Sequence, residues 1–209
     1  MRYAVLSDIH ANPGALAAVL RAADAAGAEE ILCLGDVVGY YAEPDACAAL
    51  LRERGARGIL GNHDLAVLGW KDPGDFGALA RQAVRWTRAN LGDETRRYLL
   101  SLPPHLLLPE CLLVHGALHP QPNADLHLST AARVRHSLLR LRDGGYGVPL
   151  GFFGHTHRAA IHELRGDAVL THEGSVELRP GSHYLINPGS VGQPRDGDPR
   201  AAYAVIDDN

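Results

Sequence analysis

The chain is poor in lysine and carries no run of positive charge. Its 209 residues include a single lysine, Lys71, and the remaining basic residues are arginines scattered along the sequence. The formal net charge is -4. A protein that binds a nucleic-acid duplex presents a clustered positive surface, so the sequence argues against that class of partner.

Cysteine is also scarce. Cys33, Cys47 and Cys111 are odd in number, and each lies among apolar neighbours. This arrangement argues against a disulfide framework and favours reduced cysteines in the core. Thiolate metal sites, which need clustered cysteines, are not suggested by this spacing.

No apolar stretch is long enough to form a signal peptide or to cross a membrane. The first apolar run, residues 3–6, ends directly at Ser7 and Asp8. We therefore expect a cytoplasmic protein with no membrane partner. With 46% apolar residues the chain is long enough to bury a substantial core, and we expect one domain over residues 1–209.

Short apolar runs and amphipathic helices alternate in the first half of the chain. The expected strands are residues 3–6, 31–34 and 57–60, and the expected helices are residues 13–26 and 44–54. This alternation predicts a parallel sheet with crossover helices, because parallel neighbours need a long connection. Beyond a mainly helical middle, the last third has short runs between turns, including residues 175–178, which suggest consecutive antiparallel strands.

Five of the apolar runs end in a short polar motif. In chain order the motifs are Asp8-Ile9-His10, Gly35-Asp36, Gly61-Asn62-His63-Asp64, His115-Gly116 and Gly154-His155-Thr156-His157. The carboxyl ends of neighbouring strands face a common crevice in an open α/β sheet, so side chains placed just after each strand can meet there. Each motif is weak alone, but together they indicate one site.

The motifs offer two carboxylates, four imidazoles and one amide oxygen as metal ligands. These are Asp8, His10, Asp36, Asn62, His115, His155 and His157. One ion rarely needs so many ligands, whereas two ions that share Asp36 would each have four. Residues two apart in an extended segment point to the same side, so Asp8 and His10 should reach one ion together. The two histidines of the last motif, expected in a turn, should diverge to different ions.

The donor types narrow the choice of metal and of reaction. Nitrogen and oxygen ligands without thiolate suit Mn, Fe, Co or Zn better than Mg or Ca, and we expect two divalent ions with manganese first. The positive charge of two such ions exceeds the combined negative charge of Asp8, Asp36 and one hydroxide by a single unit. This net positive charge attracts an anion. A pair of ions roughly 3.5–4 Å apart generates hydroxide and clamps phosphoryl oxygens. We therefore expect a phosphate ester to be hydrolysed by a metal-bridging hydroxide, with a small phosphorylated molecule as substrate.

In this order the motifs resemble those of the calcineurin-like metallophosphoesterase superfamily, and the match spans residues 8–157. The resemblance implies an α/β fold of two mixed β-sheets packed face to face and flanked by helices, a four-layer α-β-β-α sandwich. It implies one ion held by Asp8, His10, Asp36 and His157, and a second held by Asp36, Asn62, His115 and His155.

The resemblance also assigns catalytic roles to two neighbouring residues. His63 corresponds to a histidine of the family that is not a ligand and that stabilises the transition state or protonates the leaving oxygen. Asp64 would orient His63 and favour its charged form. The residues alone allow a simpler interpretation, in which His63 is structural and Asp64 caps a helix that begins at Leu65.

A later segment is similar to the small bacterial and archaeal phosphodiesterase branch of the family. Asn187-Pro188-Gly189-Ser190 is followed by Arg195, which would bind the substrate phosphate, although the first four residues also suit a simple turn. Relatives often carry a Ser-Pro-Arg type loop after the His-Gly strand, where this chain reads Ala117-Leu118-His119-Pro120. We expect substrate choice to depend on residues 116–128.

Three functions are compatible with these residues. A phosphodiesterase is the leading hypothesis, and a dinucleoside-polyphosphate hydrolase or a protein phosphatase with the same metal centre is an alternative. A scaffold that keeps the fold without catalysis is the third, but a scaffold has no reason to keep His63 and a full ligand set.

Overall fold

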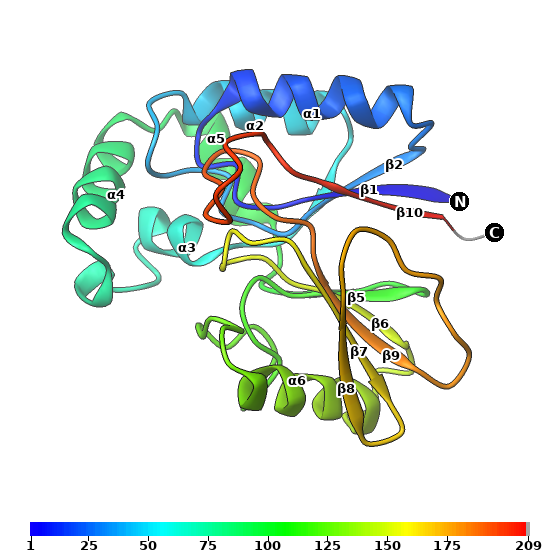
Figure 1. The fold of residues 1–209 in the computed structure, drawn as a ribbon. Helices are drawn as coiled ribbons and strands as arrows, with labels where there is room; N and C mark the ends of the chain where they lie inside the picture. The colour runs from blue at the N-terminus through cyan, green and yellow to red at the C-terminus, as the bar shows by residue number, and fades with distance from the viewer. Residues whose placement is uncertain (208–209) are drawn as a thin grey trace.

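The chain forms two mixed β-sheets in a computed structural model that describes residues 1–207 (Figure 1). The first sheet has the order β10-β1-β2-β3, with strands Ala204–Asp207, Arg2–Leu6, Glu30–Cys33 and Arg57–Gly58. The second has the order β4-β5-β6-β9-β7-β8, with strands Leu106–Leu107, Cys111–Leu113, Leu150–Phe152, His183–Asn187, Ala160–Arg165 and Ala168–His172. The parallel arrangement predicted for the first three strands is confirmed, because β1 pairs parallel with β2 and β2 parallel with β3.

Helices cover the outer face of each sheet (Figure 1). The helices are α1 (Pro13–Ala25), α2 (Pro44–Glu53), α3 (Asn62–Leu68), α4 (Ala78–Asn90), α5 (Asp93–Ser101) and α6 (Ala131–Asp143), with a short 3₁₀ turn at Pro73–Asp75. Of these, α6 lies on the second sheet and α1 and α2 lie on the first (Figure 1). The predicted four-layer sandwich is confirmed.

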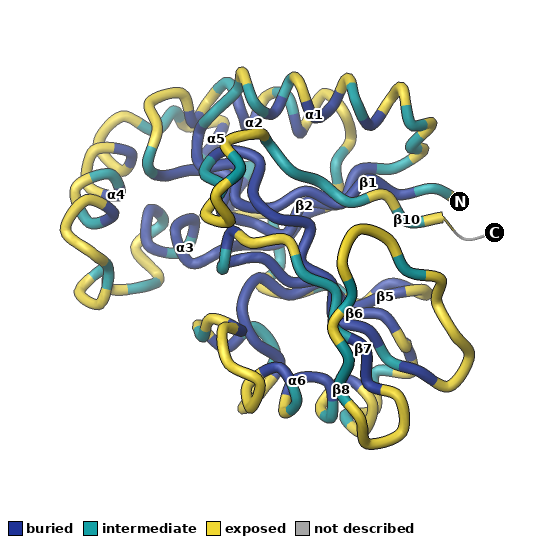
Figure 2. The backbone as a smooth tube through the Cα atoms, viewed as in Figure 1, coloured by how far each residue is buried: buried dark blue, intermediate teal, exposed yellow. Residues whose placement is uncertain are grey.

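Three buried apolar clusters correspond to the three interfaces between the four layers, and the buried backbone runs through both sheets (Figure 2). Successive side chains of β1 pack on opposite faces of the first sheet. Ala4 and Leu6 pack toward the helices, whereas Val5 packs toward the second sheet. This alternation follows from the two-residue period of a strand. Because both faces of β1 are covered, its sequence is continuously apolar.

The first helix forms where the sequence predicts it. Its N-cap Asn12 accepts a hydrogen bond from the amide of Ala15 (3.1 Å), and Pro13 occupies the first turn. The buried side chains Leu16, Val19, Leu20 and Ala23 recur at helical spacing and form one stripe against the first sheet. This helix fixes the loop that precedes it, which carries two of the candidate ligands.

The last third of the chain differs from the expected run of antiparallel strands. β6 pairs parallel with both β5 and β9, because it is a central strand buried on both faces. β7 is antiparallel to β8 and β9, and β10 leaves this sheet to pair antiparallel with β1. Residues 175–178 form no strand and instead border a hollow of about 1100 Å³ beside β10.

No helix within residues 1–207 is both long enough and apolar enough to span a membrane. The three cysteines are buried and unpaired, as the sequence predicts. The pKa of the Cys33 thiol is raised to about 12 by burial, so this residue is an inert part of the core.

A fully buried carboxylate joins β7, β8 and the start of β9. Glu163 accepts two hydrogen bonds from Arg165 (2.9 and 2.8 Å) and one from the hydroxyl of Ser182 (2.7 Å), and it lies 2.7 Å from Nε2 of His172. The hydrogen bonds from Arg165 outweigh burial and lower the pKa of Glu163 to about 2. The ionised carboxylate therefore stabilises this end of the second sheet.

We predict that Glu163→Gln lowers the free energy of unfolding at pH 7 by about 1–3 kcal/mol, because the buried Ser182 hydroxyl and the Arg165 guanidinium lose a charged acceptor. A folded pKa near 2 lies below the ordinary value of 4.5, so the stabilisation is present above pH 4.5 and is lost as the pH falls toward 2. Urea unfolding at pH 7 and at pH 3 measures both effects.

Asp198→Asn removes the carboxylate from an exposed pair with Arg200 and should change little. Equal unfolding midpoints for Glu163→Gln and the parent at pH 7 would contradict the prediction.

Candidate metal centre

The seven predicted ligands all lie where strands of the two sheets end. Asp8 and His10 follow β1, Asp36 follows β2, Asn62 begins α3 after β3, His115 follows β5, and His155 and His157 follow β6. Every one of these side chains is buried, and none belongs to a residue more than 9% exposed. The loops of both sheets meet on the same side of the sandwich, so five segments distant in sequence converge (Figure 1).

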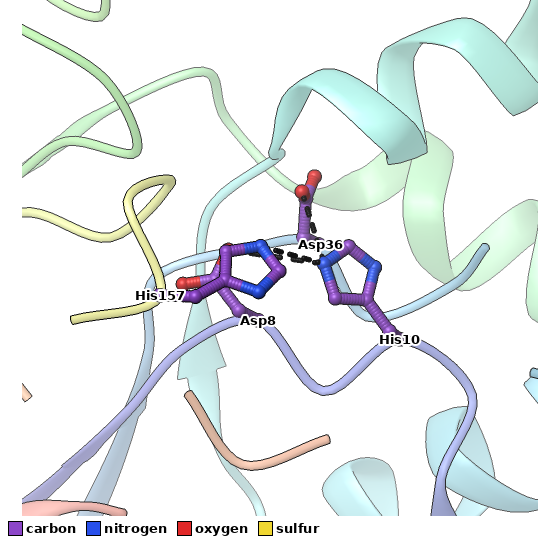
Figure 3. Close-up of side chains that lie close together, drawn as sticks. All are labelled: Asp8, His10, Asp36 and His157. Carbon is purple, nitrogen blue, oxygen red and sulfur yellow. Dashed lines mark hydrogen bonds and ion pairs between the residues drawn. The ribbon is translucent and has the colours of Figure 1, made fainter. Parts of the chain in front are cut away.

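Four of the ligands form one compact group. The ligand atoms of Asp8, His10, Asp36 and His157 lie within 4.8 Å of one another, and their side chains point together in Figure 3. Nε2 of His157 is 3.3 Å from Oδ1 of Asp8 and 3.2 Å from Nε2 of His10. Two carboxylates and two imidazoles at this spacing could hold one divalent cation.

A second group shares Asp36 with the first. Nε2 of His115 lies 3.0 Å from Oδ1 of Asn62 and 3.4 Å from Oδ2 of Asp36, and the ring of His155 is 5.1 Å from that of His115. The same Asp36 oxygen is 3.6 Å from Nε2 of His10. One carboxylate oxygen therefore faces both groups, which is the position expected of a bridge.

Three of the histidines have their Nδ1 atoms fixed by backbone carbonyls. Nδ1 of His10 is 3.3 Å from the oxygen of Val38, that of His115 is 2.8 Å from Leu34, and that of His157 is 2.6 Å from Gln193. A neutral imidazole that donates from Nδ1 leaves Nε2 unprotonated. In each of the three, this free nitrogen is the one that faces the carboxylates.

The ligands converge for a different reason from the one predicted. The segment from Asp8 to His10 is not extended, because both residues have left-handed backbone angles (φ 54° and 52°). Asp36, His155 and His157 share this conformation, with φ of 52°, 65° and 56°. Such angles are costly for residues with a Cβ and persist where the surrounding structure imposes them. Of the two histidines after β6, His157 lies in the compact group and His155 does not.

Residues 187–190 support the ligand loops from behind. The Asn187 amide donates to the carbonyl of Gly154 (2.8 Å) and to the hydroxyl of Thr156 (3.0 Å). The Ser190 hydroxyl donates to the carbonyl of Asp8 (2.8 Å), and the next two amides donate to residues 7 and 8. This segment is more than a turn, and its donors are directed to the protein.

His63 and Asp64 are both buried at the start of α3 but have separate surroundings. The His63 ring lies among the rings of His10, Tyr40 and Phe76, with centroids 4.7 to 4.9 Å away. The Asp64 carboxylate accepts from the amides of Gly61 (2.9 Å), Val38 (3.1 Å) and Val37 (3.3 Å). Within residues 1–207 no hydrogen bond or ion pair joins this carboxylate to the His63 ring. The helix begins at Asn62 and not at Leu65, so Asp64 is its third residue and accepts from the amide of the N-cap Gly61, instead of capping a helix that starts after it.

One supporting residue has no counterpart among the sequence predictions. The Asn123 side-chain oxygen accepts from the amides of His115 (2.7 Å) and Gly116 (3.0 Å), which fixes the start of the loop after β5. Asn123 also has a left-handed backbone (φ 60°). Its only signal in the sequence is an Asn in a polar loop, which is too common to identify a role.

A hollow of about 380 Å³ lies over the two ligand groups. Its walls include Asp36, Tyr40, Asn62, His63, Asp75, Phe76, Asp125, His127, His155, His157 and Arg195. The Arg195 guanidinium donates to the Tyr40 hydroxyl (3.2 Å) and lies 5.8 Å from the centre of its ring. Arg195 is therefore placed at the mouth of the site, where an anion would enter. The larger hollow beside β10 contains none of these groups.

The charges in the centre fit cations. Asp8 and Asp36 are buried, and within the described residues no lysine or arginine forms an ion pair with either. Burial opposes the charging of His115, yet with no cation bound the nearby Asp36 carboxylate raises its pKa to about 10, so a metal ion at Nε2 would take the place of a proton. Burial and the same carboxylate raise the pKa of Asp64 to about 7. Buried carboxylates without a balancing cation are costly, and the surrounding nitrogen and oxygen donors suit divalent metals.

The four-layer fold and the buried Asp and His cluster together define a protein of the metallophosphoesterase class. The chain belongs to the calcineurin-like phosphoesterase superfamily, whose domain model matches residues 1–209. Membership implies a phosphoester hydrolase in general terms and a site able to bind divalent metals.

Individual relatives agree with this assignment. The chain is 37% identical to the uncharacterized protein MJ0912 of Methanocaldococcus jannaschii, covering 98% of this chain and 82% of that protein. It is 38% identical to a metallophosphoesterase from Sphaerobacter thermophilus of known structure, with a TM-score of 0.77 over 99% of this chain and 83% of the other. The hypothetical protein PH1004 from Pyrococcus horikoshii OT3, 18% identical, shares the fold with a TM-score of 0.76, over 99% of this chain and 83% of that one.

Gly61, the residue before Asn62, is tightly packed against the loop that carries Asp36. A Cβ at Gly61 would collide with the Asp36 carboxylate and its backbone nitrogen. We predict that Gly61→Ala costs about 1–3 kcal/mol of stability and weakens metal binding, because Asp36 must move. Thermal unfolding and a Mn²⁺ titration measure the two effects.

Gly14→Ala is the matched control, because the nearest atom to its added Cβ is 3.8 Å away and the residue lies inside α1. This variant should be neutral or more stable by up to about 1 kcal/mol, with unchanged metal binding. Equal behaviour of the two alanine variants would contradict the close packing of Gly61 against Asp36.

Proposed function

We propose that this chain is a phosphoesterase with a dinuclear metal centre, and that phosphodiesters are its preferred substrates. The observation that carries the proposal is the position of Asp36, whose Oδ2 atom faces His10 on one side (3.6 Å) and His115 on the other (3.4 Å). A single carboxylate with nitrogen donors on both sides is suited to bridge two cations.

The proposed ligand sets follow the two groups of side chains. Asp8, His10, Asp36 and His157 hold one ion, and Asp36, Asn62, His115 and His155 hold the other. The ions are divalent, with manganese as the first choice and Fe, Zn or Co as alternatives. When bound, they supply a hydroxide nucleophile at neutral pH and positive charge for the phosphoryl oxygens.

The protein's own residues bind and orient the substrate. Arg195, at the mouth of the hollow, offers its guanidinium to a phosphate oxygen. His63 lies beside the compact ligand group and faces the hollow, where it stabilises the transition state or donates a proton to the leaving oxygen. Asp64 holds Gly61 and the loop after Asp36 together, which positions His63 through the backbone.

The proposed substrate is a small phosphorylated molecule in the cytoplasm. The net charge of -4 and the absence of a basic run argue against a nucleic-acid duplex. A dinucleoside polyphosphate or a phosphoprotein would use the same centre. A panel of a diester, a monoester and a dinucleoside polyphosphate, assayed with Mn²⁺, separates these substrates, and the proposal expects the diester to be hydrolysed fastest.

We predict that Asp36→Ala loses both ions and the hydrolysis, because the bridging carboxylate belongs to both ligand sets. Elemental analysis after dialysis against Mn²⁺, compared with the parent protein, measures the ions. A variant that retained two ions and the parent rate would sink the proposal.

His63→Ala should behave differently from Asp36→Ala. We predict that it keeps both ions but loses on the order of 10²-fold in kcat, since His63 acts on the substrate and not on the metals. Elemental analysis and steady-state kinetics on the diester give the two readouts. Loss of an ion would instead assign His63 to the ligand shell.

A further inference from the structure

Each histidine ligand has one ring nitrogen with a partner outside the metal centre. In His155 this is a different nitrogen from the one in the other three histidines. In His10, His115 and His157 the outer nitrogen is Nδ1, which faces a backbone carbonyl. In His155 it is Nε2, which lies 3.3 Å from Oδ1 of Asp125. A carboxylate beside Nε2 favours a proton on that nitrogen, and a neutral imidazole protonated there leaves Nδ1 of His155 free to bind a cation.

Asp125 is itself held on two sides. Its other oxygen, Oδ2, is 2.5 Å from Nζ of Lys71, the only lysine of the chain. Lys71 follows α3, where its amide donates to the carbonyl of Leu65 (3.3 Å). On the opposite side, Ala124 forms two backbone hydrogen bonds with Ala117 (2.9 Å each), so Asp125 directly follows a closed bridge in the loop after β5.

The plane of the His155 ring is also fixed. His127, two residues after Asp125, stacks on it with a centroid distance of 3.9 Å and an angle of 14° between the planes. The loop after β5 therefore controls His155 twice, by a carboxylate at its edge and by an imidazole on its face. Both Asp125 and His127 line the hollow over the ligands.

We propose that Asp125 is a positioning residue of the metal centre, whose carboxylate lies beside Nε2 of His155, keeps the proton of the imidazole on that nitrogen and turns Nδ1 toward the second ion. Lys71 fixes the carboxylate and balances its charge, so that Asp125 stays outside the ligand shell. This inference rests on the proposed dinuclear centre. A carboxylate behind a metal-bound histidine sets its orientation and basicity, and its loss typically costs 10- to 100-fold in metal affinity.

Mn²⁺ titration of the whole protein, followed by the EPR signal of free Mn²⁺, tests the proposal. Asp125→Ala should weaken the second ion by about 10- to 100-fold and leave the first unchanged, because His155 belongs to the second ligand set alone. Asp125→Asn keeps an acceptor oxygen and should recover most of the affinity. Lys71→Met should fall between the parent and Asp125→Ala.

Asp75→Ala is the matched control, since Asp75 lines the same hollow and is exposed. It should bind both ions as the parent does. The control therefore distinguishes the effect of removing any negative charge near the hollow from the specific effect of removing Asp125. An Asp125→Ala protein with the parent's affinity for both ions would overturn the inference. A parent protein that binds fewer than two ions would instead overturn the proposed function.

NMR can show which ring nitrogen of His155 binds the metal, and this measurement does not depend on the metal affinity. In ¹⁵N-histidine NMR spectra of the Zn²⁺-loaded protein, His155 should be protonated at Nε2 and metal-bound at Nδ1, the reverse of His10, His115 and His157. A metal-bound Nε2 at His155 would overturn the proposal, because Asp125 would then lie beside the ion as a further ligand.

Discussion

Two buried carboxylates, Asp8 and Asp36, govern the structure of this protein at the junction of its two sheets. Both side chains are buried among imidazoles, and burial of unbalanced charge is expensive. Divalent cations would offset that cost. Cations that bind only the folded chain would link the stability of the sandwich to the occupancy of the centre.

The sandwich brings these carboxylates together by aligning strand ends. The parallel strands β1, β2 and β3 end side by side in the first sheet, and β5 and β6 do so in the second. The ligands sit two to five residues beyond each strand, and five of them have left-handed backbone conformations that are unfavourable for an isolated chain. The hydrogen bonds from Asn187, Ser190 and Asn123 supply the restraint that keeps these loops in place.

The two sheets contribute differently to the centre. Ligands from the first sheet are supported by the adjacent helices, and the Asp64 carboxylate ties the start of α3 to the loop after β2. Ligands from the second sheet are supported by loops, among which residues 117–127 place both Asp125 and His127 against His155. The Lys71–Asp125 pair then connects the segment after α3 with the loop after β5. The loop of residues 116–128 thus contacts the candidate metal centre itself.

The sequence by itself determined the parallel strands of the first sheet, the candidate ligands and the family of the chain. Five apolar runs that each end in a polar motif are local patterns, and a parallel sheet offers few ways to use them. The partners of the last strands needed the tertiary structure, because the short runs of β6, β7 and β9 suit either strand direction. The same holds for Asp64, whose partners Val37 and Val38 are distant in sequence. Asp125 and Asn123 are ordinary loop residues until folding sets them against His155 and His115, since a hydrogen bond depends on position in space and not on residue type.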